Sequence, residues 1–159
     1  MFKKIETMKE CKKLLKTTYD IFEDMDRQGF SSGTSKPLQD VFMNEFLCVA
    51  LYFAASDREV SSLEATFLNT LFDLHLTGEQ YLEFILEQNI YSSEFEDQEL
   101  LCLTALHIYD KMTQKTDMCQ RVLRIMKIIS AELLKIDSLE EQEIEDFEMY
   151  FSKLEKKYR

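Results

Sequence analysis

The chain has 159 residues, 45% of them apolar, so it can bury one sizeable core and is too apolar to be disordered. Only 3 glycines and 1 proline are available for turns, which favours long helices over a fold of many short strands. The net charge of −11 argues against nucleic-acid binding, because a phosphate backbone requires a basic surface, and it leaves cations or a basic protein as partners.

Residues 2–27 are predicted to form an amphipathic helix, because apolar side chains recur at three- and four-residue steps. Its first part is basic and carries Lys3, Lys4, Lys9, Lys12, Lys13 and Lys16. These lysines suit contact with an anionic membrane or docking on the acidic part of the chain, and the excess of acidic residues favours docking. Residues 28–37 hold two of the glycines and the proline, so we expect a linker that separates segment 1–37 from a domain at 38–159.

Apolar periodicity predicts the remaining helices at about 38–55, 62–74, from 77 onward (where Thr77 and Gln80 have the spacing of a capping box), 97–112, 118–136 and 139–157. The first of these is apolar around most of its circumference, which is typical of a central helix. Residues 91–98 are predicted to be an acidic connection, and only residues 90–95 are ambiguous between helix and strand. The predicted fold class is all-α, a bundle of about six or seven helices with a degenerate internal repeat.

The chain shows no motif of a known catalytic site. The four cysteines are far apart and without metal-ligand spacing; they are Cys11, Cys48, Cys102 and Cys119. We expect free buried thiols, because each cysteine occupies a helix-face position. We also expect a cytoplasmic protein, because free thiols suit a reducing compartment and neither a signal peptide nor a membrane span is recognisable. His75 and His107 stand alone, and phosphate-binding loops and nucleophile motifs are absent from the sequence, so enzyme activity is not expected.

The most informative motif lies where the helix at 38–55 ends. Asp57, Glu59, Ser61 and Glu64 place four oxygen-bearing side chains in eight residues. One interpretation is a capping box, in which Ser61 and Glu64 satisfy the first amides of the next helix, with acidic residues that favour its dipole. The other is a site for a hard divalent cation such as Ca²⁺ or Mg²⁺, which binds several such oxygens.

A looser version of this junction follows the helix expected at 118–136. It contains Asp137, Ser138, Glu141 and Glu143. Two such junctions indicate a duplicated helical unit, although aligning them requires a one-residue shift. The acidic run that continues toward the C-terminus suits a solvated face or the recruitment of a basic partner.

The first junction resembles the signature of TerB-like domains, the family of the tellurite-resistance protein TerB. The resemblance rests on Ala54-Ala55-x-Asp57-x-Glu59-Val60-Ser61-x-x-Glu64, followed by a helix with Phe67-Leu68, and covers about residues 38–157. It implies an all-helical domain with an internal repeat and a role in bacterial stress responses. It also implies a divalent-metal site formed by Asp57, Glu59, Glu64, Asp137 and Glu143. Arg58 stands where the family usually has glycine.

These observations predict a non-enzymatic TerB-like module that binds a divalent cation, Ca²⁺ or Mg²⁺, at its acidic junctions and a protein partner in a bacterial stress response. The alternative is a scaffolding helical domain that docks a basic protein through its acidic faces without metal.

Overall fold

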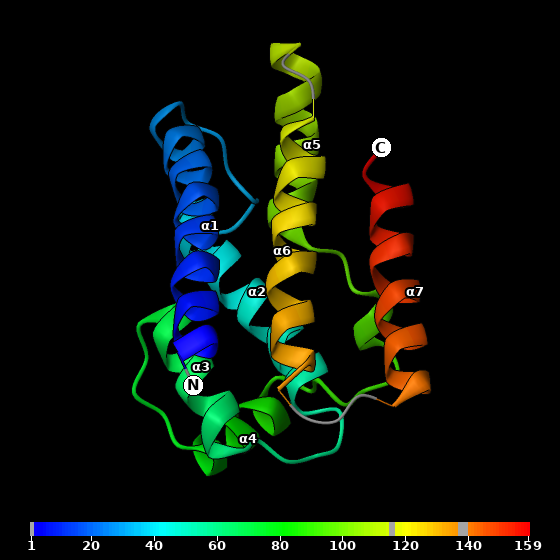
Figure 1. The fold of residues 1–159 in the computed structure, drawn as a ribbon. Coiled ribbons are helices and arrows are strands. Elements are labelled where there is room, and N and C mark those ends of the chain that lie inside the picture. Colours follow the sequence, from blue (N-terminus) through cyan, green and yellow to red (C-terminus); the bar gives the residue numbers. More distant parts are fainter. Residues whose placement is uncertain (1, 115–116, 137–139) are drawn as a thin grey trace.

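The computed structural model describes residues 2–114, 117–136 and 140–159, with side chains from residue 6 onward. Over these residues the chain forms seven α-helices, one short 3-10 helix and no strand, which confirms the predicted all-α bundle (Figure 1). The helices are α1 (Phe2–Arg27), α2 (Leu38–Ala54), α3 (Ser62–Phe72), α4 (Gly78–Glu87), α5 (Leu101–Thr113), α6 (Met118–Leu134) and α7 (Glu141–Lys157), with the 3-10 helix at Phe95–Asp97.

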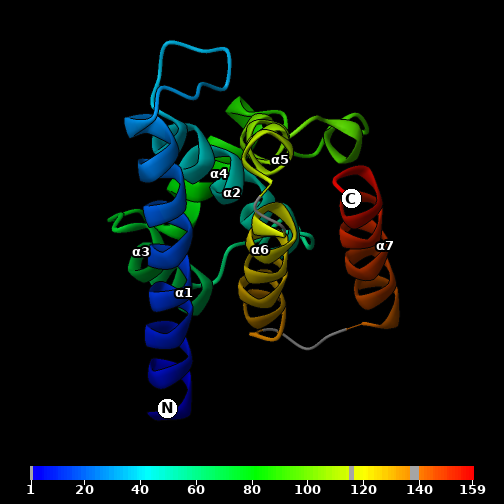
Figure 2. The ribbon, with the colours of Figure 1, turned by 90° about the horizontal axis from the view of Figure 1, so that it is seen from above.

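The helices lie in two layers. Helices α1, α6 and α7 stand side by side in one layer, while α2 and α5 lie behind them and α3 and α4 cover one end (Figures 1 and 2). Helix α2 contacts α1, α3, α4, α5 and α6, and most of its side chains are buried. The prediction of a central helix at this position is therefore confirmed.

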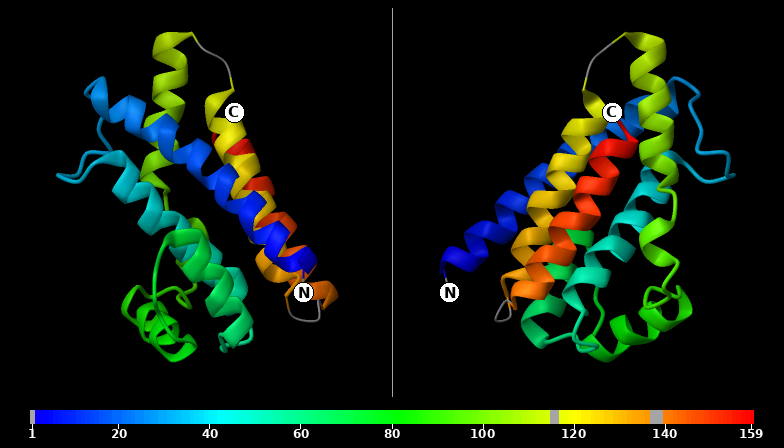
Figure 3. Two further views of the ribbon diagram at one scale, coloured as in Figure 1. Left: turned by 60° about the vertical axis from the view of Figure 1, so that its left-hand side comes forward. Right: turned by 90° about the vertical axis from the view of Figure 1, so that its right-hand side faces the viewer.

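Helix α1 runs obliquely across the bundle and shares the core with α2 and α6 (Figure 3). Its buried side chains include Met8, Cys11, Leu15, Phe22 and Met25. The Nζ atom of Lys12 lies 2.6 Å from a carboxylate oxygen of Asp73, which follows α3. The division of the chain at residue 37 stays a prediction, and so does membrane contact through the lysines.

Three helices receive their N-terminal caps from carboxylates on other helices. Asp26 of α1 accepts a hydrogen bond from the amide of Leu38 at 2.7 Å. Glu45 of α2 accepts hydrogen bonds from the amides of Leu101 at 2.7 Å and Cys102 at 3.0 Å. Asp110 of α5 accepts the amide of Cys119 at 2.9 Å, so the helix that begins at Met118 is capped by this residue. These contacts join α1 to α2, α2 to α5 and α5 to α6, at positions where helix dipoles favour negative charge.

The helix expected at 97–112 begins later, at Leu101, so that boundary was wrong. Residues 95–97 form a 3-10 helix, and Gln98 and Leu100 are extended. The Glu45 carboxylate then binds the first two amides of α5, which sets the start of the helix by a contact with α2. No described helix is both long enough and apolar enough to cross a membrane.

The four cysteines are buried and free, as predicted. Burial raises the pKa of Cys11 and Cys48 to about 11 and that of Cys119 to about 12. A thiol with so high a pKa remains protonated near neutral pH, so these side chains act as small core residues.

Candidate functional site: an acidic pocket between two helix junctions

The first junction is a short turn between α2 and α3. The amide of Arg58 donates to the carbonyl of Ala55 at 2.9 Å, and Asp57 Oδ1 accepts the amide of Glu59 at 3.0 Å. The capping box predicted next is present, because Ser61 Oγ accepts the amide of Glu64 at 3.1 Å and Glu64 Oε1 accepts the amide of Ser61 at 2.9 Å. Glu64 is only 2% exposed, so its carboxylate belongs to the inner wall of the junction.

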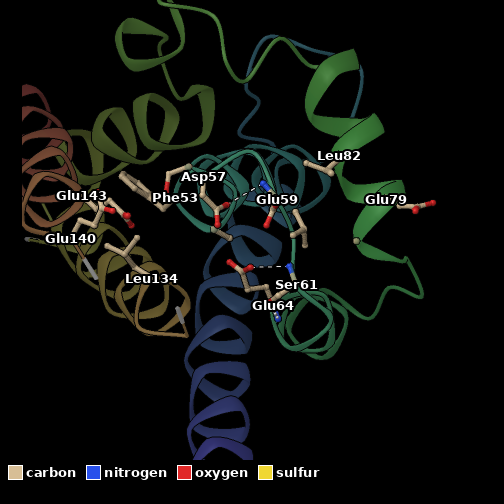
Figure 4. A pocket seen from close by; sticks show the side chains of 14 residues that line it. Phe53, Asp57, Glu59, Ser61, Glu64, Glu79, Leu82, Leu134, Glu140 and Glu143 are labelled. Atoms are coloured by element: carbon tan, nitrogen blue, oxygen red, sulfur yellow. Dashed lines mark hydrogen bonds between the residues drawn. The ribbon is translucent and has the colours of Figure 1, made fainter. Parts of the chain in front are cut away.

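The described part of the second junction, which includes Glu140 and Glu143, lies beside the first. A pocket of about 530 Å³, which we call the junction pocket, is lined by Phe53, Ala54, Ser56, Asp57, Glu59, Val60, Ser61, Glu64, Gly78, Glu79, Leu82, Leu134, Glu140 and Glu143 (Figure 4). The carboxylates come from the turn before α3, from the first turn of α3, from the start of α4 and from the start of α7. Residues far apart in the sequence therefore share one cavity because α7 packs along α6.

Four of the five residues predicted as metal ligands line this pocket: Asp57, Glu59, Glu64 and Glu143. The fifth, Asp137, lies outside the described residues. The fold therefore places these four residues around one pocket, although Glu143 is far from the others in the sequence.

The carboxylates surround the pocket without meeting at one point. In Figure 4, Glu140 and Glu143 lie on one side, Asp57 and Glu59 near the middle, and Glu79 on the far side with its carboxylate directed outward. Within the part of the chain that the structure describes, no three Asp, Glu, His or Cys side chains are grouped closely enough to hold a metal ion. A Ca²⁺ ion would need its oxygens at about 2.3–2.6 Å, so a metal site here would require these side chains to move inward.

Gly78 lets α4 pack against the first junction. A Cβ atom added at this position would lie 2.2 Å from the carbonyl oxygen of Val60, which is closer than atoms can approach. Thr77 and Gln80 form the capping box predicted for this helix, with both hydrogen bonds present. Gly78 was not predicted to be a site residue; the only signal in the sequence was a glycine at the first position of a helix, where it has no capping role.

Arg58 occupies the turn in an uncommon conformation. Its φ angle is 65°, in the left-handed region that glycine adopts at lower cost. Its guanidinium carbon lies 4.4 Å from the centre of the Tyr91 ring, and the Tyr91 hydroxyl donates to the carbonyl of Ala55 at 2.8 Å. These contacts connect the first junction to the segment between α4 and α5.

The junction pocket combines negative charge with a partly apolar wall. Asp57 and Glu59 are exposed, while Phe53 and Leu134 are buried and form part of the lining. Such a site suits a long cationic side chain, because its charged end can meet the carboxylates while its aliphatic stem covers the apolar wall. Comparisons with protein-family models, with curated proteins and with solved structures found no match to this chain.

Proposed function

We propose that this chain is a non-enzymatic helical interaction module that docks a basic segment of a protein partner in the junction pocket. One observation carries the proposal: carboxylates from the two junctions line a single cavity of about 530 Å³ whose wall is partly apolar. The volume exceeds what one metal ion requires and accommodates a lysine or arginine side chain. The net charge of −11 adds long-range attraction for a basic partner.

The resemblance to TerB-like domains supports the setting of this proposal, a bacterial stress response in the cytoplasm. The backbone of Arg58 is in the left-handed region, which is easily adopted by glycine, the residue that the family usually has at this position. The free, buried cysteines suit a reducing compartment.

The proposal is tested with a fluorescent nonapeptide that carries three lysines and otherwise alanine and glycine. Fluorescence anisotropy should show saturable binding to the intact chain, weakened at least tenfold in the double variant Asp57→Asn, Glu143→Gln. The matched control is Asp20→Asn, Asp24→Asn, which removes the same charge from exposed positions on α1. Equal losses in both double variants would reduce the effect to net charge and contradict docking in the pocket.

A divalent cation is the second candidate ligand, favoured by the four predicted ligands that line the pocket together. Calorimetric titration of chelator-treated protein with Ca²⁺ and Mg²⁺ tests it. Saturable heat that disappears in Asp57→Asn, with a metal-dependent rise in melting temperature, would favour the cation. Absence of heat alongside retained peptide binding would leave docking of a basic partner as the function.

A further inference from the structure

A second pocket opens beside the junction pocket and shares part of its wall. We call it the tyrosine pocket; its volume is about 450 Å³, and its lining includes Tyr52, Arg58, Tyr91, Glu96 and Asp146. Phe53, Ser56, Leu134 and Glu143 line both pockets. The two pockets are therefore parts of one depression that follows the first junction and the start of α7.

The tyrosine pocket already holds a guanidinium group, that of Arg58. The guanidinium carbon lies 4.4 Å from the centre of the Tyr91 ring, a distance at which a cation is attracted by the face of an aromatic ring. The ring is fixed in place, because its hydroxyl donates to the carbonyl of Ala55 at 2.8 Å. Among the described residues, none of the ion pairs within 4.0 Å includes Arg58, so the ring face is its identified partner.

Carboxylates are available around this guanidinium. Glu96 accepts a hydrogen bond from the Tyr52 hydroxyl, and Asp146 accepts one from Gln142 at 2.9 Å. Each carboxylate retains a second oxygen, and both residues are exposed. Glu96 and Asp146 therefore place two carboxylates in the lining of the pocket against the one guanidinium of Arg58.

The Arg58 side chain is exposed, and its contact with the Tyr91 ring is the interaction identified for it. A contact between an exposed cation and an aromatic ring is weak. An incoming guanidinium that reached the ring and a carboxylate together would make one interaction more than Arg58 does.

We infer that the tyrosine pocket is an arginine-recognition subsite of the partner-binding depression, and that Arg58 is an internal competitor which a partner arginine displaces. The inference rests on the proposed function and names the side chain that the partner supplies. Arginine fits better than lysine, because a planar guanidinium stacks on Tyr91 and can bind a carboxylate through two N–H groups at once. An ammonium group provides the charge alone.

The test compares two labelled nonapeptides, one with three arginines and one with three lysines in the same alanine–glycine sequence. The intact chain should bind the arginine peptide more tightly, and Tyr91→Leu should remove that preference. Arg58→Lys keeps the charge but loses the planar group, so it should tighten binding of the arginine peptide about two- to fivefold, corresponding to one exposed cation–ring contact. The lysine peptide should bind Arg58→Lys and the intact chain equally.

Three results would overturn the inference. If both peptides bind equally to the intact chain and to Tyr91→Leu, the ring does not select arginine, while docking in the junction pocket stands. If Arg58→Lys weakens binding of the arginine peptide, Arg58 belongs to the binding surface and is not a competitor. If neither peptide binds to any form of the chain, the proposed function fails and the inference fails with it.

Discussion

Arg58 combines a strained backbone with a side chain that bridges two segments. At a φ of 65°, a Cβ atom approaches the following carbonyl oxygen, and the contact with Tyr91 offsets part of that cost. The two contributions can be separated by comparing two substitutions, because alanine and glycine both remove the guanidinium and only glycine relieves the backbone.

Arg58→Gly should therefore be more stable than Arg58→Ala by about 1–2 kcal/mol in urea unfolding. Both variants lose the ring contact equally, so each serves as the other's control. If the urea unfolding curves of the two variants had the same midpoint and the same slope, the left-handed conformation of residue 58 would carry no strain.

Glu45 is the titratable residue on which the start of α5 depends. Burial raises the pKa of this carboxyl above its ordinary value of 4.5, and the amide hydrogen bonds from Cys102 and Leu101 oppose that rise without cancelling it. A carboxyl whose folded pKa is raised binds its proton more tightly when folded. Its contribution to stability is full below pH 4.5 and declines as pH rises through the raised value.

Glu45→Gln cannot titrate, so the free energy of unfolding of the intact chain minus that of Glu45→Gln should fall as pH rises from about 4.5. Urea unfolding between pH 4 and pH 7 measures this difference, and other carboxyls cancel in the subtraction. A difference that grows with pH would mean that the amide bonds lower the pKa of Glu45 below the unfolded value.

At the scale of helices, the junction pocket depends on how closely α4 approaches the first junction. Gly78→Ala should push α4 away from Val60 and lower the free energy of unfolding by about 1–3 kcal/mol, the range for overpacked positions. It should also weaken peptide binding. Glu83→Ala, at an exposed position of α4 that does not line the pocket, is the control and should change stability by less than about 0.5 kcal/mol. Similar effects from both substitutions would show that the close approach does not occur in solution.

Local signals in the sequence were sufficient for most helices. The apolar periodicity predicted α1 at 2–27 as observed and α2 within one residue, and the capping boxes at Ser61 and Thr77 were predicted from their spacing. Such features depend on residues three or four positions apart, which a sequence shows directly.

Contacts between distant residues were not predictable in the same way. The start of α5 was misplaced because Glu45, which caps it, is 56 residues from Leu101. The pocket required α7 to pack along α6, and the close approach of Gly78 to Val60 required a fold in three dimensions. The sequence indicated Asp57, Glu59, Glu64 and Glu143 as candidate ligands at two separate junctions. That they line one cavity followed only from helix packing.

At the scale of the whole molecule, α1 contributes to the same core as the helices of residues 38–159. Deleting residues 1–37 would expose the faces of α2 and α6 that cover Leu15 and Phe22, and would remove the Asp26 cap of α2. We expect the shortened chain to lack a cooperative thermal transition in circular dichroism. A sharp transition near that of the intact chain would show that residues 38–159 fold alone, as the predicted domain boundary implies.

The most direct test of the junction pocket as a docking site is residue-by-residue mapping of peptide binding by NMR. Amide shifts of the intact, isotope-labelled chain would be followed as the arginine nonapeptide is added. Docking predicts saturable shifts concentrated at residues 53–64, 78–82, 91–96 and 140–146, and their loss in Asp57→Asn, Glu143→Gln but not in Asp20→Asn, Asp24→Asn. Shifts spread over all acidic surfaces, or equal in the two double variants, would contradict it.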